Sequence, residues 1–259
     1  AGVPGLGALN TGGSAQVSSV SCAAPGSCVA GGYYDSRAGA AGHQLAFVVS
    51  ETNGSWDTAQ QVAANSTGPV FVDTVSCGSP GNCAAGGEFN KASAGAPERE
   101  QAFVASEVSG TWAAAQPVAG TVSCCGDAAV TSVSCASAGN CAAGGQYDTG
   151  GYNTVFLVNE KNGAWGKLMY VPGLNKVSRD AYLFSVSCAS AGNCAAGGNH
   201  DISAWAASEK NGVWGKETAV PGLNAIDVQS VSCASAGSCV AGGSYLGTDR
   251  QVRQGFVTQ

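Results

Sequence analysis

Short runs in which apolar and polar side chains alternate recur along the chain, and residues that favour turns follow each run. The first clear run is Ser-Val-Ser-Cys at residues 19–22, where Val20 and Cys22 share one face of an extended chain. Ala-Ala-Pro-Gly-Ser comes next and favours a turn, and a second cysteine, Cys28, follows it. This pattern predicts a β-hairpin over the Cys-x5-Cys segment.

Near-copies of this hairpin return four more times. Each copy reads x-Val-Ser-Cys, five residues, Cys and x-Ala-Gly-Gly, and the copies start at Ser19, Thr74, Ser132, Ser185 and Ser230. Behind the first four copies comes an apolar run with an aromatic residue that ends in Asn-Gly-x-Trp or Ser-Gly-x-Trp. Such a dipeptide accepts the positive φ values of a tight turn, so a second hairpin is predicted. A repeated unit of four short strands is typical of a β-propeller blade.

We therefore expect an all-β fold, a single five-bladed β-propeller over residues 1–259 with four antiparallel strands per blade. The blades are expected at about residues 17–62, 72–118, 130–171, 183–220 and 228–259. The last repeat stops after its third strand, and the N-terminal Val-Pro-Gly-Leu at residues 3–6 also occurs after the fourth strand of blades three and four. Residues 1–10 are therefore expected to complete the last blade and close the ring, which would remove an exposed strand edge.

The twelve cysteines divide into one pair per repeat and one adjacent pair. The repeated pairs are Cys22 and Cys28, Cys77 and Cys83, Cys135 and Cys141, Cys188 and Cys194, and Cys233 and Cys239. This layout predicts one disulfide per blade and an oxidising, extracellular setting. Metal binding is the rival interpretation, but neither His43 nor His200 lies at ligand spacing to a cysteine pair. Cys124 and Cys125 could bridge each other or each reach another partner.

Charge and loop length narrow the function. The net charge is −6 and no Lys/Arg cluster occurs, which argues against nucleic acid or an anionic membrane as a partner. No apolar run approaches 18 residues, and a chain that begins with Ala1 is compatible with a removed export signal, so we expect a secreted protein without membrane insertion. The turns at one face of the predicted disc are uniform, whereas the connections at the other face vary. Function is expected at the variable face.

An aromatic or histidine ring beside a polar residue follows the Gly-Gly pair in four of the repeats. These candidate binding residues are Tyr34, Asp35, Phe89, Asn90, Tyr147, Asp148, His200 and Asp201, with Tyr245 in the fifth repeat. Such a pair suits a neutral sugar, because the ring covers C–H patches while oxygen atoms bind hydroxyl groups. Repeated around a ring, the sites would attach multivalently. The alternative is that the Asp or Asn caps a turn and the ring packs on a neighbouring blade.

Catalytic groups are scarce in the sequence. The innermost strands offer Asp73 alone, which cannot supply the pair of carboxylates that glycoside hydrolysis uses. A recurring glutamate (Glu51, Glu107, Glu160 and Glu209) precedes the tight turn on the uniform face, where a structural role is expected. No Gly-x-Ser-x-Gly elbow, phosphate loop, haem motif or calcium loop occurs. We therefore predict no catalytic residue, no cofactor and no metal site.

The repeat Ser-Val-Ser-Cys-Ala-Ser-Ala-Gly-Asn-Cys-Ala-Ala-Gly-Gly at residues 185–198 resembles the disulfide-bearing repeats of secreted actinobacterial β-propeller proteins. Among these, it is similar to the lectin subunits of umbrella toxin particles, and the similarity covers the whole chain. The resemblance implies a secreted bacterial lectin that binds cell-surface glycans and that could target a larger antibacterial assembly through a protein partner. The alternatives are an extracellular protein–protein interaction adaptor and a glycoside hydrolase.

Overall fold

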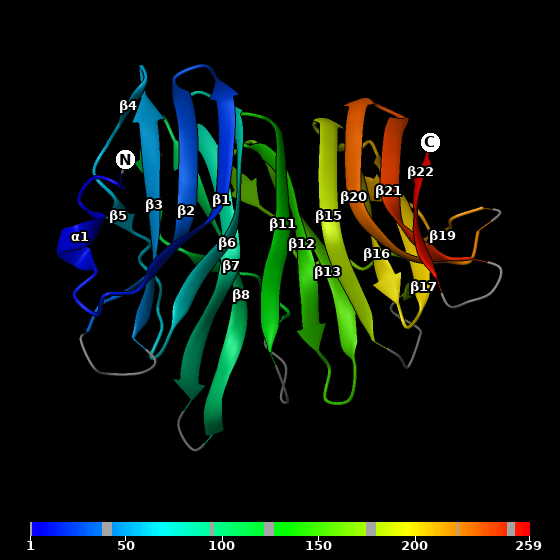
Figure 1. Cartoon of the computed structure of the whole chain (residues 1–259), viewed down its shortest axis with the longest axis horizontal. Helices are drawn as coiled ribbons and strands as arrows, with labels where there is room; N and C mark the ends of the chain where they lie inside the picture. Colours follow the sequence, from blue (N-terminus) through cyan, green and yellow to red (C-terminus); the bar gives the residue numbers. More distant parts are fainter. Residues whose placement is uncertain are drawn as a thin grey trace.

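The computed structural model describes residues 2–37, 43–93, 96–121, 127–174, 180–221, 223–247 and 252–259. Apart from the short helix α1 (Leu6–Leu9), the elements in these ranges are β-strands that form five antiparallel sheets. The sheets follow one another in chain order, and their long strands lie roughly along the same axis, pointing alternately up and down (Figure 1). Within the described ranges, no helix is long and apolar enough to cross a membrane. The predicted all-β class is confirmed.

Each sheet contains three long strands, and the first four sheets add one or two short outer ones. The first sheet is β1 (Ala15–Ala24), β2 (Ser27–Asp35), β3 (Gln44–Thr52), β4 (Ser55–Trp56) and β5 (Gln60–Gln61). The second is β6 (Val70–Ser79), β7 (Asn82–Ser93), β8 (Ala96–Val108), β9 (Thr111–Trp112) and β10 (Gln116–Pro117). The third is β11 (Ala128–Ser137), β12 (Asn140–Asp148), β13 (Asn153–Lys161) and β14 (Ala164–Trp165). The fourth is β15 (Ala181–Ser190), β16 (Asn193–His200), β17 (Ser203–Lys210), β18 (Val213–Trp214) and β19 (Thr218–Ala219), and the fifth is β20 (Ala225–Ser235), β21 (Ser238–Leu246) and β22 (Arg253–Thr258).

The first two strands of every sheet form the predicted hairpin. In the first sheet Cys22 of β1 lies directly opposite Cys28 of β2, and their Cα atoms are 3.9 Å apart. The same pairing recurs in the other four sheets with Cα separations of 3.9–4.0 Å. The prediction of one Cys-x5-Cys disulfide per repeat is therefore confirmed. Cys124 and Cys125 lie outside the described residues.

The two tight turns of a repeat lie together at one end of each of the first four sheets, which we call the turn end. The N–H of Gly54 donates to the carbonyl of Gly26 at 3.0 Å, and three equivalent bonds of 2.9 Å join the later turns. Asn53 has φ 52° and Gly54 has φ 78°, as a tight hairpin turn requires. The opposite end, where β2 stops at Asp35 and β3 starts at Gln44, carries the variable connections and is called the loop end.

The x-Val-Ser-Cys motif joins each sheet to the next. The hydroxyl groups of Ser19 and Ser21 in β1 accept hydrogen bonds of 3.1 Å from the backbone N–H groups of Val75 and Cys77 in β6. Equivalent pairs join Val133 to Thr74, Cys135 to Ser76, Val186 to Ser132, Cys188 to Ser134, Val231 to Ser185, and Cys233 to Ser187. The motif therefore specifies the contact between neighbouring sheets as well as the hairpin.

Glycine is required where the sheets approach each other. A Cβ atom on Gly31 would lie 2.5 Å from a methyl group of Val72, and one on Gly86 would lie 2.4 Å from a methyl group of Val130. The first glycine of the Gly-Gly pair therefore leaves room for a valine or leucine of the next sheet. The recurring third-strand aromatic, such as Phe103, is buried in the same apolar layers. Packing between the repeats explains these recurring residues.

The recurring glutamates at the turn end also join sheets. Glu107, Glu160 and Glu209 are 2–5% exposed. Ser50 of the first sheet donates to Glu107 of the second at 2.6 Å, and the equivalent bond from Ser106 reaches Glu160 at 2.6 Å. Burial raises the pKa of all three carboxyl groups above their ordinary value. Their contacts are those of a structural role.

The predicted closure of the ring by residues 1–10 is wrong. The fifth sheet has three strands, and the N-terminal segment packs instead on the first sheet, where Leu6 and Leu9 contact its apolar layer and Pro4 accepts a 2.9 Å hydrogen bond from Ala59. The first and fifth sheets lie at opposite ends of the row (Figure 1). The matching Val-Pro-Gly-Leu at residues 171–174 makes the same kind of contact. The carbonyl of Pro172 accepts a 3.1 Å hydrogen bond from the N–H of Glu217, just before β19 of the sheet that follows it. The shared tetrapeptide is a link between sheets rather than an outer strand.

Candidate functional site

The predicted aromatic residues of the loop end lie mostly inside the protein. Tyr34, Phe89 and Tyr147 are 2%, 1% and 7% exposed, whereas His200 and Tyr245 are half-buried. The rings of the first three pack in the apolar layer between their own sheet and the part of the chain that precedes it. Their faces are therefore not open to a sugar, and packing is the role that their burial supports. The polar neighbours of these rings remain at the loop end.

The polar residues beside these rings differ in their contacts. Asp148 Oδ1 accepts hydrogen bonds from the N–H groups of Gly150 at 2.6 Å and Gly151 at 3.2 Å, so it caps a turn. Asp201 has φ 51° and lies in the connection between β16 and β17. In contrast, Asp35 Oδ1 and Asn90 Oδ1 are buried without a hydrogen-bond donor. Only these last two offer vacant acceptors.

Two further vacant acceptors occupy a position that the sequence analysis did not select. Gln146 Oε1 and Asn199 Oδ1 are buried without a donor, and each residue directly follows a Gly-Gly pair. Leaving a buried acceptor unpaired costs about 1–3 kcal/mol. The loop end thus carries vacant oxygen acceptors in each of the first four sheets. Their signal in the sequence is that the position after Gly-Gly varies while the residues before it stay constant.

Four carboxyl groups gather between the second and third sheets at the loop end. Glu88 of β7 lies opposite Phe71 of β6, and Asp73 occupies the bulge of β6 between two paired residues. Glu100 of β8 and Asp127, just before β11, complete the group. Sequence analysis selected Asp73 alone, because it considered only the innermost strands, whereas the other three lie on β7, on β8 and just before β11.

Burial and mutual repulsion change the pKa values of these groups. Burial first, and then the charges of Asp73, Glu100 and Asp127, raise the pKa of Glu88 to about 8. Burial raises the pKa of Asp73 to about 6, and burial together with Asp127 and Asp73 raises that of Glu100. Glu88 is therefore largely protonated at neutral pH and can donate a hydrogen bond or a proton.

The described residues do not offer a metal site. No group of three or more His, Cys, Asp or Glu side chains among them could hold a metal ion. The carboxyl groups around Glu88 can bind hydroxyl groups, which can donate to ionised carboxylates and accept from a protonated one.

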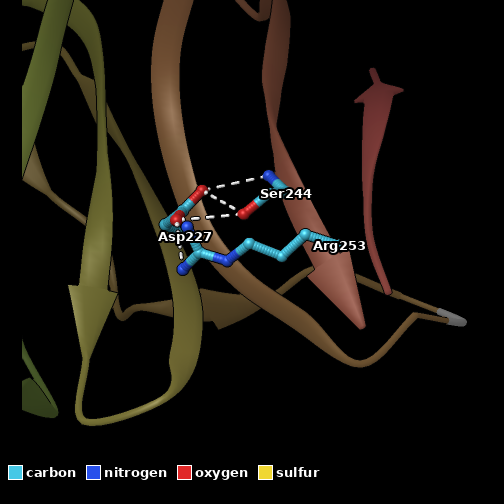
Figure 2. Close-up of polar contacts among 3 residues, drawn as sticks. All are labelled: Asp227, Ser244 and Arg253. Atoms are coloured by element: carbon cyan, nitrogen blue, oxygen red, sulfur yellow. Dashed lines mark hydrogen bonds and ion pairs between the residues drawn. The ribbon is translucent and has the colours of Figure 1, made fainter. Parts of the chain in front are cut away.

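The corresponding position of the fifth sheet is satisfied by the protein itself. Asp227 of β20 is 3% exposed and accepts hydrogen bonds of 3.0 Å from the N–H and hydroxyl groups of Ser244, which follows the fifth Gly-Gly pair (Figure 2). Its other oxygen lies 3.6 Å from the guanidinium group of Arg253, whose side chain is 64% exposed. Because these groups pair with one another, the fifth sheet presents no vacant acceptor at this position.

Comparisons with known proteins establish the fold alone. No family model and no curated protein matches the chain. A solved structure of a Dyadobacter fermentans protein of unknown function is similar, with a TM-score of 0.56 and 11% identity over 95% of this chain and 83% of that one. A Trypanosoma rangeli sialidase in complex with the inhibitor DANA aligns with a TM-score of 0.46 and 12% identity over 95% of this chain and 47% of that one. The Dyadobacter fermentans protein shares the fold of this chain, and function has to be argued from the site.

Proposed function

We propose that this protein is a secreted, non-catalytic carbohydrate-binding protein that holds the hydroxyl groups of a glycan at its loop end. The observation that supports this most is the row of vacant buried acceptors on Asp35, Asn90, Gln146 and Asn199 in the first four sheets. Hydroxyl groups are donors that such acceptors can use, in place of the water that buried polar atoms otherwise bind. Five disulfides support an oxidising, extracellular setting.

The aromatic contribution differs from the one that the sequence predicts. The buried Tyr147 bonds its hydroxyl to that of Tyr170 at 2.8 Å, and Tyr170 is 41% exposed. Tyr170 can therefore offer the ring surface that covers sugar C–H groups. Weak contacts repeated over four sheets would bind a surface glycan multivalently. Under the resemblance to umbrella toxin lectins, the same sites would direct a larger particle to a bacterial surface.

A glycan array, including bacterial wall polysaccharides, tests this proposal. Replacing Asn90 or Asn199 by Ala should weaken binding by about tenfold each, the equivalent of one hydrogen bond of about 1.4 kcal/mol. Asn82→Ala and Asn193→Ala are matched controls, because these residues lie on the same two strands at the turn end. The controls should bind like the unmodified protein. Absence of binding to every glycan would refute the proposal.

A second function, glycoside hydrolysis, is favoured by one observation, the carboxyl group of Glu88 with its pKa of about 8 beside other carboxyl groups. A protonated carboxyl group can serve as the general acid of a glycosidase. Release of reducing ends from a bound glycan, abolished by Glu88→Gln, would favour this function. Binding without release, retained in Glu88→Gln, would favour the lectin.

A further inference from the structure

Each of the four contacts between neighbouring sheets has two unlike halves. The earlier sheet supplies two hydroxyl acceptors and a glycine, as Ser19, Ser21 and Gly31 do in the first sheet. The later sheet supplies two backbone N–H donors and valine or leucine side chains, as Val75 does in the second. A row of sheets built in this way ends with one unused half at each end.

The outward face of the fifth sheet carries the unused acceptor half. Ser230 and Ser232 occupy the acceptor positions and are exposed, whereas the paired serines and threonine of the other four sheets are half-buried. Val240 and Val257 of this face are 42% and 78% exposed. The matching residues of the first sheet, Val29 and Val48, face the second sheet and are 1–2% exposed. The fifth sheet therefore presents a complete contact surface without a following sheet.

The glycine of this surface is retained although no residue in the described part of the chain fills its space. A Cβ atom on Gly242 would meet only its own sheet, the carbonyl of Phe256 at 3.5 Å. At Gly31, Gly86, Gly144 and Gly197 a Cβ atom would lie 2.4–2.6 Å from a Val or Leu side chain of the next sheet. The fifth sheet thus keeps room for an incoming side chain.

The outward face of the first sheet carries the unused donor half. Val17 and Val20 of β1 are 41% and 57% exposed, whereas Val72 and Val75, at the same positions of β6, are 0% and 5% exposed. Trp56 of β4 is 39% exposed. The N-terminal segment covers the outer part of this face through Val3, Leu6 and Leu9, and leaves the β1 edge uncovered.

We propose that the outward face of the fifth sheet binds the outward face of the first sheet in a second copy of this chain. In this contact the hydroxyl groups of Ser230 and Ser232 accept hydrogen bonds from the N–H groups of Val20 and Cys22, and the exposed valines of both faces become buried. The occupant is a second copy because the two halves match a contact that the chain already makes four times. The two faces also lie at opposite ends of the row (Figure 1), so two copies can meet end to end without a change in conformation.

The association is head-to-tail, because the two surfaces are different. Such contacts build rings when the rotation closes and filaments when it does not. The contact leaves the loop end free, so this proposal does not depend on glycan binding. The contact would also cover the exposed strand β1 and its apolar neighbours, which protects a strand edge that could otherwise pair with other chains.

Sedimentation velocity over a range of concentrations, with Val20→Lys and Val257→Lys variants, tests the proposal. Each variant blocks one half, and both side chains are already exposed, so the fold should be retained, as circular dichroism can verify. Val213→Lys is the matched control, since Val213 is 71% exposed on the short strand β18. We expect the unmodified protein and the control to associate, and each variant alone to stay monomeric.

Mixing the two variants is the decisive step. The Val20→Lys copy keeps an intact fifth sheet and the Val257→Lys copy an intact first sheet, so an equimolar mixture should form 1:1 dimers and nothing larger. A monomeric unmodified protein at all concentrations, as expected if one copy closed into a ring, would overturn the proposal. Association that survives both substitutions, or a mixture that stays monomeric, would also overturn it.

Discussion

The carboxyl group of Glu88 should make the stability of the protein depend on pH in a predictable direction. Its pKa is about 8 in the folded protein, against an ordinary value of 4.5. The folded protein therefore binds this proton more tightly than the unfolded chain does. The stabilisation is fully present below a pH of about 4.5 and is lost as the pH rises through about 8. The Glu88→Gln variant has no such proton to lose.

The size of the effect follows from the difference in pKa. The difference between 4.5 and about 8 corresponds to roughly 5 kcal/mol. Since the side chain keeps partial contact with water, we expect roughly 2–5 kcal/mol in practice. Urea unfolding under non-reducing conditions at pH 5 and pH 9 measures it. Glu88→Gln should gain that amount over the unmodified protein between pH 5 and pH 9.

Two comparisons keep this test specific. Glu51→Gln changes a glutamate at the turn end, away from the carboxyl groups around Glu88, and should follow the pH dependence of the unmodified protein. Asp73, whose pKa is about 6, should add a smaller loss between about pH 4 and pH 6 in both proteins. Equal pH dependence in Glu88→Gln and the unmodified protein would refute the reasoning.

Three further predictions concern the repeat. Ser134→Ala removes the acceptor of the Cys188 N–H and should lower the free energy of unfolding by about 1 kcal/mol. Ser232 is exposed at the end of the row, so Ser232→Ala should leave the free energy of unfolding unchanged when dilute protein is titrated with urea. Gly86→Ala forces a methyl group against the third sheet and should cost about 1–3 kcal/mol, but Gly242→Ala should cost clearly less. Reduction of the disulfides should lower the thermal midpoint, since each small closed loop contributes roughly 2 kcal/mol; an unchanged midpoint would contradict this.

Local patterns predicted most of the repeat. The Cys-x5-Cys hairpin and the tight turn at Asn53 and Gly54 depend on residues that are neighbours in sequence, so alternation and turn chemistry were sufficient. The N-terminal segment was assigned wrongly because a shared tetrapeptide does not reveal which sheet it contacts. Pro4 bonds the sheet that follows it, as Pro172 does.

The site was harder to predict, because it depends on which side of a strand faces a neighbouring sheet. Tyr34 and Phe89 carry the right chemistry for a sugar but face the buried side. The residue just before the ring is Glu88 in the second repeat, before Phe89, and Gln146 in the third, before Tyr147. The carboxyl groups around Glu88 come together only when β6, β7 and β8 pair and the third sheet packs beside them. Such a convergence leaves no spacing in the sequence.

Backbone amide NMR of the isotope-labelled protein, titrated with fragments of bacterial wall polysaccharide, tests most directly whether the loop end is the binding surface. We predict concentration-dependent shifts at Asp35, Asn90, Gln146 and Asn199, with the turn-end amide of Gly54 unchanged. Shifts confined to the turn end, or no shifts with any fragment, would contradict the account.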